Sequence, residues 1–513
     1  MMLTNGSRGR WWGLAAMVAA LLVVGLDAMV LNVALPTLAN QLGATTTELQ
    51  WLTDSYTLAF AGLLLPAGLL GDRFGRKRFL IGAIILFGIA SVFAAYAGSI
   101  GELIWTRAVM GLGAAAIMPL TLSVLPSMFG KAERTKAVAM LTASVAVGLP
   151  LGPLVGGFLL EHFWWGSVFL INVPVAAIAV VGLVLLVPES SDPSAPRLDL
   201  TGTVLSVLAI AGLVYGIIQV PADGWTNPIV LVSLAVGVVA LAAFLAWERQ
   251  VKNPLVDLNL FRNKRFAWAT GAATGVSFVM FGAFFLLPLY FQNVTGAGPM
   301  GTGLRLLPLV AGLLVGGLAS EKVAARFGVR AVITAGLLLL GAGLVGLALV
   351  DADTGYGLVA AALGLAGLGL GTAMAPAMDT VLGELPEAKT GVGSALANAC
   401  RQVGAALAVA ILGSLLNAVY QARLDDLPGT VPAAAGGAAR ENVAAAMTAA
   451  GRLGGRPGAD LARLARESYV AGMSVVMWVC VAICVLVAAA VAAFMPAGRR
   501  TTTKEPASLT MAA

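Results

Sequence analysis

Charged residues are scarce in this chain, and their scarcity decides the class of protein. Only 11% of the 513 residues are charged, whereas 59% are hydrophobic. Soluble domains carry roughly a quarter charged residues, and the mean hydropathy of +0.92 points the same way. Too few polar residues remain to cover a 52.1 kDa globule in water, so most of its surface must face lipid. A soluble fold is excluded.

Cysteine and histidine are also nearly absent, which removes the ligands that most metal sites need. The cysteines, Cys400, Cys480 and Cys484, stand inside apolar runs, where a free thiol packs as a small hydrophobe. The single histidine, His162, ends an apolar run beside two tryptophans, a pattern typical of the membrane interface. No Walker loop of the form GxxxxGK[ST] is present. We therefore predict no metal, no disulfide, no cofactor, no nucleic-acid partner and no ATP-driven step.

Long apolar runs dominate what is present. Stretches of about twenty residues, the length that crosses about 30 Å of hydrocarbon, succeed one another along the chain. About fourteen can be placed, which predicts an all-α integral membrane protein. They lie near residues 12–38, 49–70, 79–98, 102–126, 136–159, 165–187, 201–220, 226–247, 266–293, 301–322, 331–350, 356–379, 391–417 and 468–495.

Lysine and arginine cluster in alternate connections, which sets the predicted orientation. With the N-terminus in the cytoplasm, the inner connections collect most of these cations and the short outer connections collect none. An even number of spans places both termini in the cytoplasm, and residues 496–513 become a polar cytoplasmic tail. The connection 418–467 is external and rich in arginine, but long translocated loops escape the charge rule. We expect short external helices or a hairpin there.

A charged, glycine-rich string stands between the spans 49–70 and 79–98. Its glycines permit a tight turn and close helix approach, while its acid can pair with a cation or cap a helix end. Inner-side positive charge alone would explain the cations, but not the acid and the glycines together. A related string at 325–330 predicts an internal repeat. The residues concerned are Gly68, Gly71, Asp72, Arg73, Gly75 and Arg76.

Two further spans carry residues that a plain lipid-facing helix does not need. Arg107 lies inside the span 102–126, where a cation costs roughly 2.5–3.5 kcal/mol. It therefore either faces a partner in the interior or extends toward the interface. The span 136–159 combines small residues at helical spacing with prolines, which favours close helix contact and a bend; ordinary small-residue packing is the alternative. That string contains Gly148, Gly152, Pro153, Gly156 and Gly157.

Taken in this order, the charged string, Arg107 and the glycine string resemble the signatures of the major facilitator superfamily. The glycine string is similar to the antiporter motif of that family. Leu26–Pro36, which contains Asp27, resembles a signature of the fourteen-helix drug:proton antiporter group. The resemblance implies two six-helix bundles around a central cavity, with two inserted central helices, working by alternating access. It also implies that the charged string governs conformational switching.

The expected domains follow from this plan. Residues 1–187 form the N-terminal six-helix bundle, and residues 188–265 form the two inserted helices with a cytoplasmic linker. Residues 266–495 form the C-terminal six-helix bundle, which carries the long external loop 418–467. We expect the protein to work as a monomer.

Acids inside the membrane are rare here, and they are the candidates for proton coupling. Asp27 and Asp54 lie clearly inside spans, both in the predicted outer half. An unpaired carboxylate in a low dielectric favours its protonated form and can exchange a proton as a cavity opens and closes. The alternatives are that Asp27 is locked to a cation such as Arg107, and that Asp54 is merely solvated. Arg401 is a second interior cation for a charge network, with Gln402 and Asn398 as candidate partners.

The leading hypothesis is a proton-coupled antiporter that exports drug-like or antibiotic molecules across the cytoplasmic membrane of a bacterium. Its partners would be the small-molecule substrate, protons and the bilayer, and its role would be multidrug efflux or antibiotic resistance. Proton-coupled uptake or facilitated transport of another small molecule is the alternative within transport. A membrane receptor or enzyme would need an appended domain or a catalytic constellation, and the sequence contains neither. We therefore predict a transporter, not an enzyme.

Overall fold

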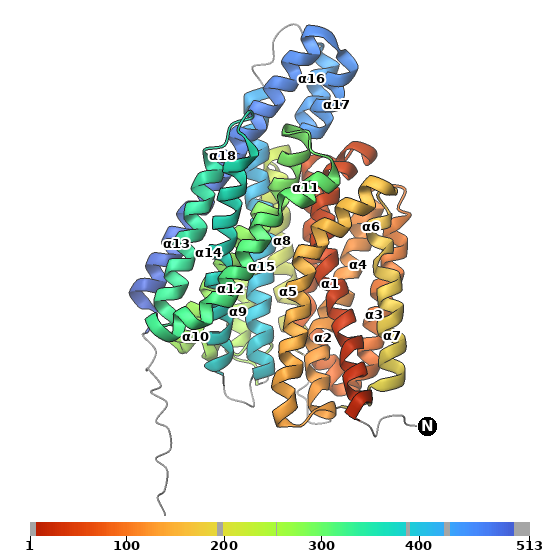
Figure 1. Cartoon of the computed structure of the whole chain (residues 1–513), viewed down its shortest axis with the longest axis vertical. Helices are drawn as coiled ribbons and strands as arrows, with labels where there is room; N and C mark the ends of the chain where they lie inside the picture. The colour runs from red at the N-terminus through yellow and green to blue at the C-terminus, as the bar shows by residue number, and fades with distance from the viewer. Residues whose placement is uncertain (1–6, 192–198, 253, 386–389, 425–430, 497–513) are drawn as a thin grey trace, which may run out of the picture.

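The computed structural model describes residues 7–191, 199–252, 254–385, 390–424 and 431–496, and the regular structure in these ranges is helical (Figure 1). Thirteen stretches are long and apolar enough to cross a membrane. Helix α5 (Lys131–His162) adds another long helix of 32 residues. Each coincides with one of the predicted spans, so the all-α transmembrane prediction is confirmed.

The elements follow one another closely along the chain. Their bounds are α1 (Ser7–Leu42), α2 (Thr46–Phe74), α3 (Arg76–Ala95), α4 (Ile100–Met128), α5 (Lys131–His162), α6 (Ser167–Leu170), α7 (Asn172–Leu186), α8 (Leu200–Asp223), α9 (Pro228–Glu248), η1 (Leu258–Arg262), α10 (Lys264–Leu289), η2 (Tyr290–Val294), α11 (Pro299–Arg305), α12 (Leu307–Phe327), α13 (Val329–Ala348), α14 (Tyr356–Gly383), α15 (Thr390–Leu424), α16 (Ala433–Glu441), α17 (Val443–Leu453) and α18 (Gly455–Phe494).

Two predicted spans are each divided into two helices just before a proline. The first break lies between α6 and α7, ahead of Pro174, and the second lies between α11 and α12, ahead of Pro308. Proline lacks the N–H that would bond to the carbonyl one turn earlier, and its ring crowds that carbonyl. The helix axis is therefore interrupted at these two points.

The last span begins earlier than its hydropathy predicts. Helix α18 starts at Gly455 rather than near residue 468, so its first turns lie beyond the apolar part of the span. These turns are amphipathic, and their apolar side is buried at Leu461 and Ala465. Hydropathy measures how much of a helix is apolar enough for lipid, not where the helix begins.

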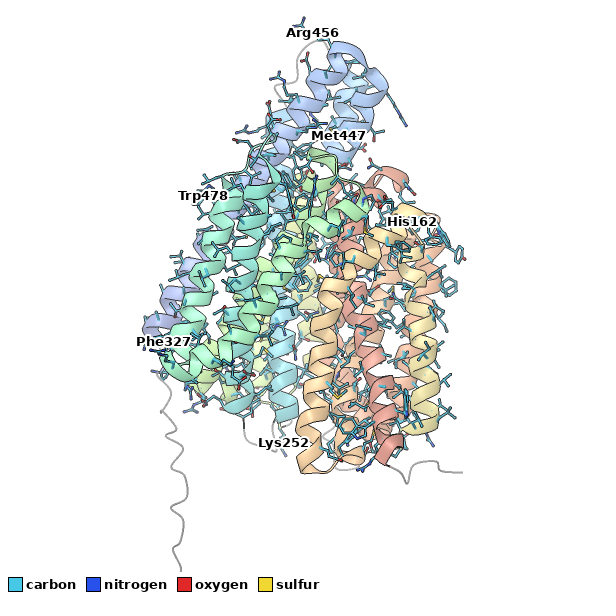
Figure 2. The ribbon with its side chains drawn as sticks, in the orientation of Figure 1. His162, Lys252, Phe327, Met447, Arg456 and Trp478 are labelled. Carbon is cyan, nitrogen blue, oxygen red and sulfur yellow. The ribbon has the colours of Figure 1, made fainter. Side chains whose placement is uncertain are left out.

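The long connection 418–467 forms short helices, as expected, apart from residues 425–430, which lie outside the described residues. Helices α16 and α17 fold back on each other at one end of the molecule, and α17 packs on α18 (Figure 1). We call this the hairpin end, and the end where α1 begins the opposite end. His162 lies toward the hairpin end and Lys252 lies at the opposite end (Figure 2).

The helices pack in two groups joined by a central pair. In the first, α1 packs on α5 and α7, while α2 and α3 pack on α4. In the second, α14 packs on α12 and α13, and α18 packs on α13 and α15. Helix α8 contacts both α2 and α15, and α9 packs on α8. The domain boundaries themselves stay predictions, and the tail from residue 497 onward lies outside the described residues.

Two glycines turn the chain sharply at equivalent points of the two groups. Gly75 joins α2 to α3 with φ +117°, and Gly328 joins α12 to α13 with φ +86°. Side-chain-bearing residues rarely adopt such backbone angles. The two related strings of the sequence thus form the same kind of junction, as an internal repeat predicts.

Candidate functional site

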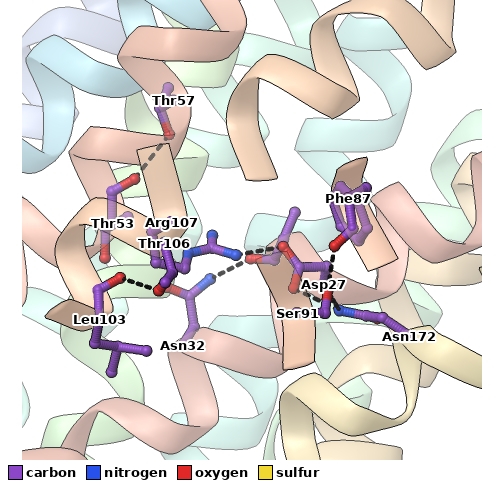
Figure 3. A network of polar contacts seen from close by, with 11 residues as sticks. Asp27, Asn32, Thr53, Thr57, Phe87, Ser91, Leu103, Thr106, Arg107 and Asn172 are labelled. Carbon is purple, nitrogen blue, oxygen red and sulfur yellow. Dashed lines mark hydrogen bonds and ion pairs between the residues drawn. The ribbon is translucent and has the colours of Figure 1, made fainter. Parts of the chain in front are cut away.

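Asp27 lies in the interior of α1, where side chains of two other helices bind it (Figure 3). Arg107 of α4 forms an ion pair with one carboxylate oxygen, and both side chains are only 2% exposed. Asn172 of α7 donates from Nδ2 to the other oxygen at 3.0 Å. A buried charge is tolerated only when it is paired and hydrogen-bonded. The ion pair and the hydrogen bond from Asn172 therefore connect three helices, α1, α4 and α7.

Two more helices complete this network. Tyr56 of α2 places its ring 4.3 Å from Arg107 Cζ, within the range of a cation–π contact. Ser91 of α3 accepts a hydrogen bond from Asn172 at 3.3 Å and donates to the carbonyl of Phe87 at 2.8 Å. Ser91 was not among the predicted site residues, because a single serine in an apolar helix does not reveal its partner.

The pairing decides between the two alternatives for Asp27. The carboxylate is locked to Arg107, so the interpretation of Asp27 as an unpaired acid is wrong for this conformation. Arg107 faces an interior partner, as one of its two alternatives predicted, and its burial excludes an arginine that extends to the interface. The physical reason is that the attraction between the two ions offsets part of the cost of burying each of them.

Asp54 is the buried acid that has no partner. Its side chain is 0% exposed, and among the described residues no group hydrogen-bonds to either carboxylate oxygen. Removing an unpaired ionised carboxylate from water costs many kcal/mol, so the neutral, protonated carboxyl is the favoured form at this position. The alternative of a merely solvated Asp54 is therefore wrong, because α2 is covered at this depth by neighbouring helices.

Gln50 lies one helical turn before Asp54 and joins the two helix groups. Its side chain is 0% exposed. It donates from Nε2 to α15, with acceptors at the Val409 carbonyl (3.0 Å), the Ala410 carbonyl (3.1 Å) and Ser414 Oγ (3.3 Å). These hydrogen bonds hold α2 against α15, while Gln50 Oε1 is buried without a hydrogen-bond partner among the described residues. Gln50 was missed by the sequence analysis, since one amide near a helix start has no distinctive pattern.

Further contacts join the two groups toward the hairpin end. Gln292 of η2 donates to the carbonyl of Val33 in α1 at 2.8 Å. Asn442, which begins α17, donates to the carbonyl of Ala44 at 2.6 Å. Thr46 donates to the carbonyl of Glu441 at 3.0 Å. We call these contacts and those of Gln50 the hairpin-end barrier. The two helix groups are thus in direct contact at the hairpin end, and we call this arrangement closed at that end.

At the opposite end, ion pairs lie within each group. Arg10 of α1 pairs with Glu133 of α5 at 3.3 Å, and Arg265 of α10 pairs with Glu384 after α14 at 2.5 Å. These pairs fasten each group internally and do not bridge the two. The two groups are therefore linked differently at the two ends.

The predicted charge network of Arg107 and Arg401 does not exist as one network. Arg401 lies on α15 and donates to Ser277 Oγ at 3.1 Å and to Asn398 Oδ1 at 3.1 Å. Among the described residues, no acid pairs with it. Arg107 is bound to Asp27 on α1 instead. The two arginines belong to different helix groups, so each finds its own partners. The expected contact between Asn398 and Arg401 is thus confirmed.

The charged string folds into a tight junction at the opposite end. Asp72 accepts from Arg76 Nε at 2.6 Å, one of the two outcomes predicted for this acid. A Cβ on Gly71 would overlap Leu120 of α4, so Gly71 permits close packing of α2 on α4, whereas a Cβ on Gly68 would make an ordinary contact with Pro119 at 3.4 Å. Arg73 is exposed. Gly75 supplies the turn.

Glu189 holds this junction from the chain segment after α7. Its carboxylate accepts from the backbone N–H of Lys77 at 3.1 Å and from that of Arg78 at 3.2 Å. It therefore caps the start of α3, where a negative charge is favoured by the helix dipole. The sequence analysis missed Glu189, because an acid after an apolar run resembles any solvated residue.

The glycine string of α5 lies at two helix interfaces. A Cβ on Gly148 would lie 3.1 Å from the backbone of Gly25, and one on Gly152 would overlap Met29, so both glycines allow α5 to touch α1. Gly156 faces Val30 in the same way. Close helix contact is what small residues at this spacing predict.

The end of the same string meets the other helix group. A Cβ on Gly157 would lie 2.8 Å from Met300 of α11. A Cβ on Gly303 would overlap the carbonyl of Pro153. Backbones of the two groups therefore touch here, on the side of the hairpin end. The α5 string contributes to the closed state of that end.

Comparisons with known proteins agree with this architecture. A profile of the Major Facilitator Superfamily matches residues 17–409. The tetracenomycin C resistance and export protein of Streptomyces glaucescens is 35% identical over 501 residues, covering 96% of this chain and 92% of the relative. The multidrug efflux pump LfrA of Mycolicibacterium smegmatis is 33% identical over 483 residues, covering 94% of this chain and 95% of the relative.

Solved structures show the same fold. A bacterial homolog of the human lysosomal transporter Spinster, in an inward-facing and occupied conformation, superimposes with a TM-score of 0.68 at 17% identity. The match covers 96% of this chain and 98% of that chain. The predicted helical fold with two bundles is therefore found among known membrane transporters.

Proposed function

Because the chain belongs to the major facilitator superfamily, we propose that it exports drug-like or antibiotic molecules across the cytoplasmic membrane in exchange for protons. The family consists of transporters, so the receptor and enzyme alternatives fall away. Relatives that cover nearly the whole chain are named for antibiotic export and multidrug efflux. This supports export over uptake.

The observation that carries proton exchange is the burial of Asp54. A carboxyl with 0% exposure and no hydrogen-bond partner is stable only when it holds a proton. Gln50, one turn away, belongs to the hairpin-end barrier. When the barrier opens, water reaches Asp54 and lowers the free energy of its ionised carboxylate by hydrating it. Asp54 thus gains and loses a proton with the state of the barrier.

Asp27 couples to the same cycle through its pair with Arg107. A proton that binds Asp27 removes the charge that holds Arg107, and the guanidinium must then find other partners. The contacts of this pair and of Asn172 connect five helices, α1 to α4 and α7. Protonation therefore biases the N-terminal group between two arrangements.

The two helix groups can move relative to each other because the contacts at the two ends of the molecule differ. The hairpin-end barrier and the α5–α11 contact must open for release, while the junction around Asp72 and Glu189 adjusts at the opposite end. Rocking of two bundles about a central site is the movement that such an arrangement allows. The glycine string of α5 acts as a contact surface rather than a binding site.

We assign the hairpin end to the outside of the cell and both termini to the cytoplasm. Lys and Arg gather in the connections of the opposite end, which the positive-inside rule places in the cytoplasm. Labelling tests this directly. Arg456, in the first turn of α18, lies at the hairpin end (Figure 2), so a single cysteine placed there, in a chain without its native cysteines, should react with an impermeant maleimide in intact cells.

The function is tested with the purified protein in liposomes. An imposed proton gradient should drive a drug-like dye against its concentration gradient, and a protonophore should stop this movement. Movement that ignores the proton gradient would refute proton exchange, while leaving export open. Proton-driven accumulation in the direction of uptake would instead favour the alternative transport function. Asp54→Asn serves as the matched variant, measured with and without the protonophore.

A further inference from the structure

Helix α10 ends in the π-helical turn η2, and this turn forms one wall of a cavity at the hairpin end. The cavity has a volume of about 100 Å³. Its other walls are Arg305, which ends α11, and Thr354 and Tyr356 at the start of α14. It lies within the C-terminal group and apart from Asp27, Asp54 and the Gln50 contacts. The proton-coupled export proposed above does not involve this cavity.

Arg305 brings a positive charge to this cavity that the described residues do not neutralise. Its guanidinium donates to Thr295 Oγ1 and lies 5.9 Å from the ring of Phe291 and 5.6 Å from the ring of Tyr356. None of the ion pairs among the described residues involves it. Because a guanidinium carries five N–H donors, several remain for a ligand.

Tyr290 adds a second donor that lacks a partner. Its side chain is 1% exposed, and its hydroxyl is buried without a hydrogen bond in the described structure. Tyr290 lines the cavity together with Arg305. A buried hydroxyl without a partner loses about 1–3 kcal/mol. A ligand oxygen in the cavity would satisfy it.

The start of α14 strengthens the preference for a negative ligand. Gly355, the N-cap of this 28-residue helix, has no side chain that could accept a hydrogen bond from the first N–H groups. Helix N-termini attract anions through these groups and the helix dipole. The acids of the preceding connection, Asp351 and Asp353, are exposed to solvent and form no ion pair with Arg305.

We propose that this cavity binds a phosphate group, held by Arg305, the hydroxyl of Tyr290 and the N-terminus of α14. A cavity of about 100 Å³ has room for one tetrahedral phosphate. Arginine matches phosphate oxygens with parallel N–H donors. The chemistry fits either the phosphodiester of an anionic lipid or free inorganic phosphate.

The surroundings favour the lipid as the source. Leu304, next to Arg305, is 50% exposed, and Leu358, in the first turn of α14, is 53% exposed. Both are exposed apolar side chains, next in sequence to the lining residues Arg305 and Val359, and acyl chains can cover them. Arginine near the end of a membrane-spanning helix lies at the level of the lipid headgroups. A headgroup phosphate therefore reaches the cavity without leaving the bilayer.

The test compares phosphatidylglycerol with inorganic phosphate as probes. The full-length protein is placed in nanodiscs of phosphatidylcholine with and without phosphatidylglycerol, and bound lipid is counted by native mass spectrometry. In a second arm, phosphate is titrated into phosphatidylcholine nanodiscs and the melting temperature is followed. Arg305→Gln should weaken phosphatidylglycerol binding about tenfold, and Tyr290→Phe about threefold. Arg456→Gln, at an exposed arginine in the first turn of α18, is the matched control and should change nothing.

Each outcome decides. Retention of phosphatidylglycerol that depends on Arg305 and Tyr290 supports the lipid site, and phosphate binding with the same dependence supports the site with the free ion as its source. Binding of both probes that is unchanged in Arg305→Gln and Tyr290→Phe, or absent in the wild type, would overturn the proposal. Because Tyr290→Phe keeps the shape of the core, a loss of binding there is not a loss of folding. None of these readouts depends on proton-driven export.

Discussion

Replacing Arg107 by leucine leaves Asp27 as a buried carboxylate held only by Asn172, at 3.0 Å. Removal of one partner from a buried ion pair costs about 3–5 kcal/mol, because the remaining charge is uncompensated. The ring contact with Tyr56, 4.3 Å from Arg107 Cζ, adds about 1 kcal/mol. The unfolding free energy should therefore fall by about 4–6 kcal/mol. We expect the melting temperature of the purified protein to drop by several degrees.

Two matched variants make this prediction specific. Asp27→Leu combined with Arg107→Leu removes both charges, so most of the lost stability should return, while transport stays absent. Arg10→Leu breaks a pair whose side chains are 38% and 42% exposed, and it should cost less than about 1 kcal/mol. A melting temperature of the Arg107→Leu variant equal to that of the wild type, or a double variant no more stable than the single one, would refute the reasoning.

Three other outcomes are expected. Gly152→Ala places a methyl group against Met29 and should abolish efflux at matched expression, whereas Gly271→Ala, with open space around its Cβ, should not; equal efflux by both would show that the close α1–α5 contact is dispensable. Asp54→Asn should fold like the wild type, since an amide is neutral as the buried carboxyl is, but dye transport in liposomes should no longer follow the proton gradient; preserved coupling would exclude Asp54. Asn442→Ala removes one barrier hydrogen bond and should raise the population open at the hairpin end about fivefold, measured as distances between spin labels on α17 and the α1–α2 connection; unchanged distances would contradict its role.

Much of the fold could be predicted from the sequence because lipid imposes a simple rule. Every span needs about twenty apolar residues, so hydropathy located each membrane helix. The helix boundaries were harder: α18 continues into water on an amphipathic face, where Leu461 is buried against neighbours rather than lipid. The two broken spans also follow from local chemistry, since Pro174 and Pro308 remove backbone donors.

The site was predictable only where a residue is costly by itself. Arg107 and Asp27 stood out because a charge in lipid needs a reason, but only the fold decides that they pair with each other rather than remain apart. Gln50 and Ser91 are common residues whose partners lie far away in sequence, so no local pattern distinguishes them. For Arg401, the sequence indicated an interior cation correctly, but not that its contacts are neutral.

The hairpin of α16 and α17 offers a way to inhibit the protein from outside, without a ligand at the substrate site. It is covalently part of the second helix group, yet Asn442 and Thr448 hydrogen-bond to the α1–α2 side of the first at 2.6 Å and 3.1 Å. An antibody fragment whose epitope includes both α17 and Asn40 binds only while those bonds hold. Its binding energy would then shift the equilibrium toward that state in proportion to its preference. Such a fragment would arrest transport by selecting a conformation, with no need to resemble a substrate.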